Sequence, residues 1–377
     1  MTKRSSRIQI IFFCVFIGFM LILSAVLPDR KFSEKENRDL QQFPKFSFET
    51  LFAGKYTGKA ETYTADQFPF RDSWMTLKAR CELATGKKQN DDVYLCKDET
   101  LIEEYRAPDS KLLETNIAAV KRFAEGSSVP VYFALIPGNA EIHSGLLPEN
   151  APNDSQKNVI DYCYANSGAK NIDVESSLLA HKDEYIFYRT DHHWTTLGAY
   201  YGYETLLKAM GGSPAPLSDF PPETVSKDFY GTVYSKSGIS WVKPDEIDIR
   251  AKQQPGTEIT NYLTGKPAET PMYDKAFLDK KDKYAMFMGG NTSLEVVKTD
   301  KTDAPKILIL RDSYMDSVTP YLQNNFSEIH LIDLRYYKTQ AMQQSISDYV
   351  KENGIDEVLI CYGVSTFGTD TNVLLLQ

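Results

Sequence analysis

The sequence has little cysteine, little histidine and no excess of positive charge. Five cysteines in 377 residues exclude a protein built on a disulfide framework, which would be far richer in cysteine. Acidic residues (51) outnumber lysines and arginines (42), so the formal charge is −9. This balance argues against sequence-independent binding to nucleic acid, which needs a basic surface to displace counterions. The 42% of hydrophobic residues suffices for a globular body with a sizeable core.

One long run of the chain is free of charge, the twenty residues Ile8–Leu27. As a helix it spans about 30 Å, the thickness of a bilayer core. Lys3, Arg4 and Arg7 precede it, which favours a cytoplasmic N-terminus. A cleaved signal peptide is the alternative, but its apolar part is usually only about 7–15 residues long. We therefore predict a single-pass protein of the cell membrane, with residues 1–7 as a cytoplasmic tail and 8–27 as a transmembrane anchor.

Everything after residue 27 is then expected outside the cytoplasm. This outer part carries a formal charge of −12, because the first 27 residues hold three cations and no acidic residue. Its four cysteines are Cys81, Cys96, Cys163 and Cys361. The short separation of Cys81 and Cys96 is compatible with a disulfide, and free buried thiols are an equal alternative.

Residues 28–98 read as an irregular membrane-proximal region with short helices and turns, and 99–377 as a folded domain. In the domain, short apolar runs alternate with helical patterns, which indicates a doubly wound, mostly parallel α/β sheet covered on both faces. Residues 213–293 break the alternation and predict an inserted β-rich lobe. The expected strands are 129–136, 171–174, 306–310, 329–334 and 357–362, and the expected helices are 112–126, 155–166, 175–180, 195–210, 315–325 and one marked by Met342, Ile346 and Tyr349.

The first segment that suggests chemistry is Arg311-Asp312-Ser313, directly after the strand 306–310. Ligands of open α/β sheets bind at the carboxyl ends of the strands. A serine at this edge is exposed, and N–H groups at the start of a following helix can stabilise an oxyanion. Capping of that helix by Ser313 is the alternative.

The second segment is Asp191-His192-His193-Trp194. A nucleophilic serine needs a base, and the base needs a carboxylate that fixes its tautomer. Asp-x-His can supply both groups, Asp191 and His193, from one loop. A hydrogen-bonded histidine pair at a helix start is the alternative. We predict neither a metal nor a cofactor, because adjacent histidines tend to point apart and no CxxC or HExxH motif accompanies them.

At these residues the chain resembles the DHHW family of membrane-anchored extracytoplasmic proteins. The resemblance rests on YRTDHHWTTLGAYYGYETL and on FSEKENRDL, LFAGKYTGK, DQFPFRD, LIPGNAEI, MGGN and LRDSY in this order. The family is similar to the SGNH-hydrolase-like, flavodoxin-like domains of alginate and related polysaccharide O-acetyltransferases. The resemblance implies that Asp191, His193 and Ser313 form a catalytic triad. It also implies a circularly permuted sheet, since the Asp-His pair precedes the serine.

The resemblance further implies residues around the triad that contact the oxyanion or the substrate. Arg311 stands where many relatives have glycine, which puts the oxyanion geometry in question. Gly290-Asn291 is matched only weakly to the oxyanion donors of SGNH enzymes, and a simple turn is its alternative. The candidates are Asn139, Trp194, Gly290, Asn291, Arg311 and Tyr314.

The function implied is that of an extracytoplasmic O-acetyltransferase. It would move an acetyl group through a serine acyl-enzyme to hydroxyls of a cell-surface or secreted polysaccharide. A multispanning membrane-bound O-acyltransferase would be the donor partner, and nucleic acid is not an expected partner. The alternatives are a carbohydrate esterase with the same triad and a non-catalytic polysaccharide-binding or assembly factor. A Ser–His hydrogen bond would favour the enzymes, and Arg311 in the pocket the binding factor.

Overall fold

The computed structural model describes residues 3–262, 266–337 and 344–376. The predicted helix position at Met342 and residues 1–2 of the predicted cytoplasmic tail lie outside these ranges. The chain divides into two compact units. The first comprises the residues up to Asp91 with Ser235–Ser240, and the second comprises Asp92–Tyr234 and the residues from Trp241 onward.

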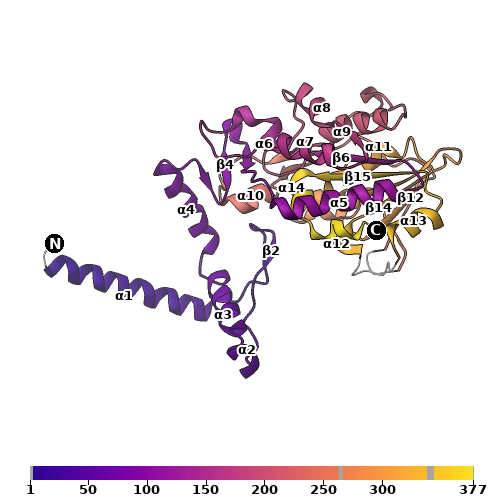
Figure 1. The fold of residues 1–377 in the computed structure, drawn as a ribbon. Coiled ribbons are helices and arrows are strands. Elements are labelled where there is room, and N and C mark those ends of the chain that lie inside the picture. The colour runs from indigo at the N-terminus through magenta and orange to yellow at the C-terminus, as the bar shows by residue number, and fades with distance from the viewer. Residues whose placement is uncertain (1–2, 263–265, 338–343, 377) are drawn as a thin grey trace. The chain divides into compact units, whose positions relative to one another are not determined.

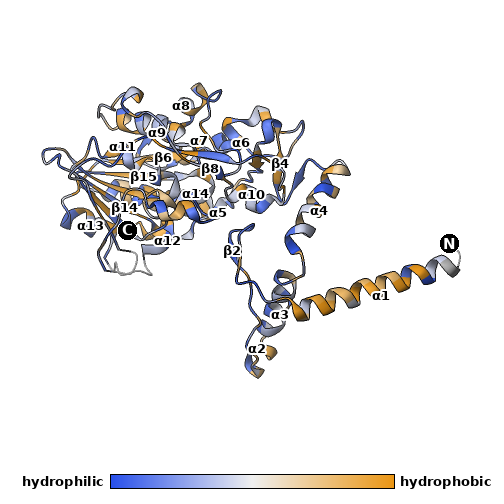
Figure 2. Ribbon diagram, turned by 180° about the vertical axis from the view of Figure 1, so that it is seen from behind, coloured by the Kyte–Doolittle hydropathy of each residue, from blue (hydrophilic) through white to orange (hydrophobic). Residues whose placement is uncertain are grey.

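The first unit is mainly helical. Its helix α1 (Lys3–Val26) contains a segment, Ser5–Val26, that is long and apolar enough to cross a membrane, and Figure 2 shows that most of its residues are hydrophobic. The region after it is more regular than expected, because α3 and α4 hold 12 and 14 residues. The other elements are β1 (Phe32–Ser33), β2 (Arg38–Asp39), α2 (Phe48–Phe52), α3 (Lys55–Asp66), α4 (Arg71–Ala84) and β3 (Gln89–Asn90).

The second unit is built on an eight-stranded sheet with the order β11-β10-β12-β14-β13-β15-β6-β7. Five neighbouring strands are parallel: β14 (Glu328–Ile332), β13 (Lys306–Arg311), β15 (Glu357–Gly363), β6 (Val131–Ile136) and β7 (Lys170–Ile172). The remaining three pair antiparallel: β12 (Leu294–Lys298), β10 (Glu258–Asn261) and β11 (Ala268–Glu269). The mixed α/β class with a mostly parallel sheet is therefore confirmed.

Helices cover both faces of this sheet (Figure 1). The strand β13 shows why, since Ile307 and Ile309 belong to one apolar cluster and Leu308 and Leu310 to the other. The period of two in a strand sends successive side chains to opposite faces, so a continuous apolar run needs cover on both. One face packs against α8 (Glu175–Ala180), α9 (Thr196–Ala209) and α11 (Thr319–Leu322), and the other against α5 (Ser110–Gly126), α7 (Gln156–Asn166), α13 (Ile346–Glu352) and α14 (Val364–Thr369).

Two expectations about this unit differ from the structure. The segment 213–293 does not form one separate lobe, because β10 and β11 extend the main sheet while β8 (Glu223–Phe229) and β9 (Asp245–Ile249) form a sheet of their own. Pairing with β12 lets Ile259 of β10 become buried. The expected helix 315–325 is broken into η6 (Ser313–Asp316) and α11. Pro320 lies in the first turn of α11, and a proline does not continue a preceding helix.

Short elements complete the unit, and all five cysteines of the chain are unpaired. The short elements are β4 (Val93–Leu95), η1 (Lys97–Glu99), β5 (Leu101–Glu103), α6 (Asn139–Ile142), η2 (Ser144–Leu146), η3 (Leu217–Asp219), α10 (Thr232–Ser237), η4 (Lys275–Asp279), η5 (Tyr284–Met286), α12 (Leu334–Tyr337) and η7 (Thr371–Leu375).

Candidate active site

The turn that carries Ser313 lies at the carboxyl end of the central strand β13. The carboxylate of the preceding Asp312 anchors this turn, because it accepts hydrogen bonds from the backbone N–H of Tyr314 (3.1 Å) and of Gly363 (2.8 Å). Gly363 is the last residue of the neighbouring strand β15. Ser313 is thus fixed at the sheet edge where α/β proteins bind ligands.

The loop that carries Asp191 and His193 is held by a buried carboxylate, Asp245. Asp245 accepts from the backbone N–H of Arg189 (3.0 Å) and of Thr190 (2.8 Å). The loop then leads into α9, which Thr195 caps because its hydroxyl accepts from the Gly198 N–H. Buried carboxylates with several donors are rigid anchors, so the loop presents its side chains in one arrangement.

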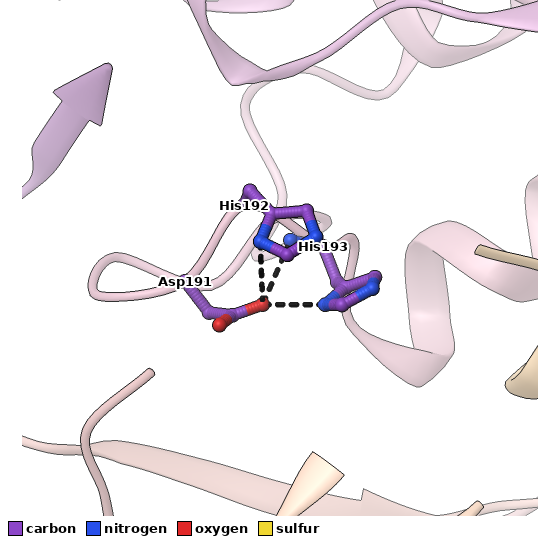
Figure 3. Close-up of side chains that lie close together, drawn as sticks. All are labelled: Asp191, His192 and His193. Atoms are coloured by element: carbon purple, nitrogen blue, oxygen red, sulfur yellow. Dashed lines mark hydrogen bonds and ion pairs between the residues drawn. The ribbon is translucent and has the colours of Figure 1, made fainter. Parts of the chain in front are cut away.

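The three residues form a continuous chain of hydrogen bonds. His193 Nε2 lies 2.8 Å from Ser313 Oγ, and His193 Nδ1 lies 2.6 Å from Asp191 Oδ1. Figure 3 shows that the same oxygen also accepts from the His193 backbone N–H (3.0 Å). The other oxygen of Asp191 accepts from the Thr232 N–H (2.7 Å) and hydroxyl (3.0 Å). The carboxylate has no proton to donate, so Nδ1 carries the proton and Nε2 is free to accept one from the serine.

Burial and charge keep this arrangement in the required protonation state. Burial and the neighbouring His192 lower the pKa of His193 to about 4, against the opposing effect of Asp191. Burial alone would raise the pKa of Asp191, but His192, His193 and the hydrogen bonds that the carboxylate accepts bring it well below its usual range. At neutral pH the site therefore pairs a neutral imidazole with a carboxylate, as a general base requires.

Aromatic rings hold the imidazole from both sides. Tyr284 stacks on His193 with the centroids 3.7 Å apart and an angle of 8° between the rings, and His192 lies on His193 at 3.8 Å. The Tyr284 hydroxyl is also 3.1 Å from the Ser313 carbonyl oxygen. Neither Tyr284 nor Thr232 could be found from the sequence, because neither lies in a motif with the residues that it contacts.

Trp194 is fully buried and is not available to a sugar, contrary to expectation. Its Nε1–H points at the Tyr314 carbonyl (3.1 Å) and at the Ser317 hydroxyl (3.0 Å). A Cβ added at Gly202 would lie 2.7 Å from its ring, so the glycine makes room for the indole. Trp194 therefore ties the histidine loop to the serine segment.

Arg311 is buried away from the serine hydroxyl and does not line the cleft described below. Its guanidinium lies 2.7 Å from the carboxylate of Asp316 and 3.4 Å from that of Glu295. Burial raises the pKa of Glu295 to about 8 and that of Asp316 to about 7, with Arg311 opposing the rise in both. The arginine that stands where the resemblance implies a glycine is thus held in this ionic cluster. The Ser–His hydrogen bond forms beside the cluster.

A cleft of about 260 Å³ lies beside the triad. It is formed at the carboxyl ends of β6 and β15 and includes Asn139, Tyr314, Asp191 and His192 in its wall. Of the predicted substrate contacts, the structure thus brings Asn139 and Tyr314 to this cleft.

Gly290 and Asn291 are not brought to the cleft or to the triad. They follow η5 in a turn in which Gly290 adopts a φ of +91°, a conformation that favours glycine. Among the described residues, no hydrogen bond joins either of them to Asp191, His193 or Ser313. The turn, the alternative to an oxyanion role, is what the structure shows.

Asp191, His192 and His193 offer ligand atoms that lie within 4.8 Å of one another. The same atoms are engaged in hydrogen bonds, since His193 Nδ1 contacts Asp191 and His192 Nδ1 lies 2.6 Å from the Thr232 hydroxyl. A metal ion would have to break the contacts that orient His193. The donor set therefore fits a proton relay better than a cation.

The fold and the site define an α/β protein with a Ser–His–Asp constellation at the carboxyl edge of its sheet. The chain belongs to the DHHW protein family, whose model matches residues 91–332. This membership confirms the resemblance found in the sequence.

Similar proteins extend over most of the chain. A Pseudomonas syringae pv. tomato protein named "Probable alginate O-acetylase AlgJ" is 25% identical over 366 residues, covering 90% of this chain and 85% of the relative. The crystal structure of a DHHW family protein from Eubacterium siraeum superposes with a TM-score of 0.65 at 25% identity, covering 76% of this chain and 95% of the other. Bacillus cereus PatB1, solved with a sulfonyl adduct, gives a TM-score of 0.63 at 19% identity, with 74% and 97% covered, and shares the fold.

Proposed function

We propose that this chain is an O-acetyltransferase that uses Ser313 as its nucleophile and a polysaccharide hydroxyl as its acceptor. The observation that carries the proposal is the hydrogen-bond chain from Ser313 through His193 to Asp191. The name of the Pseudomonas syringae relative, an alginate O-acetylase, supports the same chemistry.

The reaction proceeds in two halves. In the first, His193 Nε2 takes the proton of Ser313 as Oγ attacks the carbonyl carbon of an acetyl donor. The donor's leaving group then departs with that proton, which leaves an acetyl ester on Ser313. At the start of η6 the N–H groups of Tyr314 and Met315 are already bonded to Asp312, so the Ser313 N–H is the donor there that is left to stabilise the developing oxyanion.

In the second half, His193 takes the proton of a sugar hydroxyl whose oxygen attacks the acetyl-serine. The tetrahedral intermediate collapses to the O-acetylated sugar, and the proton returns to Ser313 Oγ. Asp191 stabilises the imidazolium that forms in both halves. Transfer exceeds hydrolysis where a sugar hydroxyl is positioned better than water.

Two other functions are alternatives to the proposed transferase, and each differs from it in one feature. A carbohydrate esterase would use the same triad, with water in place of the accepting sugar. A non-catalytic binding factor was favoured by Arg311, and the burial of Arg311 in its ionic cluster removes that reason. The Ser–His contact favours the two enzymes.

The test uses the full chain purified in detergent with a chromogenic acetyl ester. We expect the wild type to release the chromophore and Ser313→Ala and His193→Ala to lose more than about 10³-fold in rate. Ser218→Ala, at an exposed serine, is the matched control and retains the wild-type rate. A serine-directed sulfonyl fluoride should modify Ser313 alone. Equal rates for Ser313→Ala and the wild type would overturn the proposal.

Mass analysis of an added oligosaccharide separates the transferase from the esterase. The transferase leaves an extra acetyl group on the sugar, and the esterase releases all of the acetyl as acetate. A sugar that stays unmodified while the ester is consumed would favour the esterase.

The proposed location rests on the apolar helix α1, and the proposed donor rests on the family resemblance. We propose that α1 anchors the chain with its N-terminus in the cytoplasm, so the site faces outward and receives acetyl groups from a multispanning membrane-bound O-acyltransferase. Co-expression with such a partner should raise polymer acetylation. Full polymer acetylation by the purified chain with a soluble donor would contradict the need for the partner.

A further inference from the structure

We infer that the cleft beside the triad binds an uncharged sugar unit of the acceptor and discriminates against uronic acids. This inference rests on the proposed function and adds the class of sugar that the site accepts.

The position of the cleft suits an acceptor. Its wall contains Asp191 itself, His192 next to the base and Tyr314 next to the nucleophile. Its volume of about 260 Å³ is below the range of about 300–1,000 Å³ that encloses drug-sized ligands, so it holds one small unit such as a single sugar ring. Apolar side chains, among them Leu101 and Ile136, also line it, which suits the C–H faces of a sugar.

Two buried amides supply unused hydrogen-bond donors to the cleft. Gln156 is 2% exposed and Asn139 is 9% exposed, and both line the cleft. The Gln156 side-chain oxygen accepts from the Gly138 N–H (2.7 Å), and that of Asn139 contacts His143 Nδ1 (2.6 Å). Neither side-chain nitrogen has a partner among the described residues. Both nitrogens can therefore donate to a ligand in the cleft that carries hydroxyl or ether oxygens.

The Gln156 amide lies close to Gly138 and to the hydroxyl of Tyr314. A Cβ added at Gly138 would lie 3.7 Å from Gln156 Nε2 and 3.9 Å from the Tyr314 hydroxyl. The amide therefore faces the cleft beside the tyrosine that follows the nucleophile. A sugar oxygen bound to Gln156 lies on the triad side of the cleft.

The charges of the cleft oppose an anionic sugar. Glu103, Glu104 and Asp191 line it, and Arg106 is its one lysine or arginine. The Arg106 guanidinium is already paired with Glu104 (2.8 Å) and with Asp92 (2.9 Å). A uronate carboxylate would therefore meet like charges and no unpaired cation, and such juxtaposition excludes a ligand more strongly than missing contacts do. The hydroxyls of a neutral sugar can instead donate to these carboxylates.

The inference is tested by binding of two probes of equal length, maltopentaose and pentagalacturonic acid, to the full chain in detergent. Calorimetry without an acetyl donor measures binding apart from turnover. We expect maltopentaose to bind at least about tenfold more tightly. Gln156→Glu should weaken its binding about tenfold, because the variant keeps the oxygen that Gly138 needs and loses the donor. Asn158→Asp, the same change at an exposed position of α7, is the matched control and should leave binding unchanged.

Three results would overturn the inference: tighter or equal binding of pentagalacturonic acid, no binding of either sugar, or wild-type binding by folded Gln156→Glu. Circular dichroism checks the fold of each variant. The chromogenic ester assay is run on the same preparations. Ester turnover that depends on Ser313, together with a preference for the uronate, would refute only the class of sugar. Selective maltopentaose binding without ester turnover would refute only the acetyl transfer.

Discussion

Replacement of Asp191 by asparagine separates the orienting role of this residue from its size. Each oxygen of the carboxylate accepts two hydrogen bonds in the structure. An asparagine has one acceptor oxygen and one NH₂ group that can only donate. If the NH₂ group faces His193, Nδ1 must become an acceptor and Nε2 must carry the proton. If it faces Thr232, it meets a backbone donor.

The first orientation removes the base, since a protonated Nε2 cannot accept the Ser313 proton. The wrong tautomer in such a triad lowers kcat by about 10⁴, which corresponds to about 5 kcal/mol of activation free energy. The second orientation loses two hydrogen bonds to a buried group and lowers the free energy of unfolding by about 1–3 kcal/mol. Either orientation of the asparagine therefore lowers kcat, as long as the imidazole is misoriented in part of the population.

The assay is steady-state turnover of a chromogenic acetyl ester, with the thermal unfolding midpoint measured on the same sample. We expect kcat to fall by about 10³–10⁴ in protein that remains folded. Asp161→Asn, at an exposed position of α7, controls for the loss of one negative charge. A folded Asp191→Asn protein with kcat within about tenfold of the wild type would refute the assignment of Asp191 as the orienting carboxylate.

Three further predictions test the surroundings of the triad. Ester turnover should fall as the pH drops through about 4, because protonation of His193, whose pKa burial lowers to about 4, removes the base; a limb near 6.5 would contradict this. Gly231→Ala should lower kcat by about 10²-fold or more in rate assays, since its Cβ would lie 2.2 Å from Asp191 Oδ2, and an unchanged rate would refute the tight packing. Arg311→Met should lower the free energy of unfolding by about 3–5 kcal/mol at pH 9 in denaturant titrations. The loss should be smaller at pH 6, where Glu295, with its pKa raised to about 8 by burial, takes up a proton; a pH-independent loss would contradict a buried ionic role.

Much of the second unit was predictable because its signals are local. The strands β6, β13, β14 and β15 are short apolar runs between helical patterns, and each lies within a few residues of its predicted range. The pattern could not show that β10 joins the main sheet, since four residues of a polar segment acquire this place only by pairing with β12. The break between η6 and α11 was signalled by Pro320, which the helical reading of 315–325 did not weigh.

The candidate site likewise contains residues that local sequence signals predict and residues that only the tertiary structure reveals. Asp191 and His193 share a loop and Ser313 follows a strand, so the residue types and the element boundaries pointed to them. Thr232 lies 41 residues from the carboxylate that it contacts, and no spacing rule connects the two. Trp194 was predicted to contact the substrate, because the residue type alone does not tell whether an aromatic side chain is exposed or buried. Its burial follows from the glycine opposite its ring.

Arg311, two residues before Ser313, leaves the hydrogen bond of Ser313 with His193 in place, and the structure gives the reason. The Arg311 side chain is fully buried and forms an ion pair with the buried Asp316. Asp316 belongs to the same short helix as Ser313, so the ion pair ties the strand to the helix from below. The hydrogen bond of Ser313 with His193 involves no atom of the Arg311 side chain. A charged residue at this position is therefore compatible with the hydrogen-bond chain from Ser313 through His193 to Asp191 when the interior supplies its counter-ions.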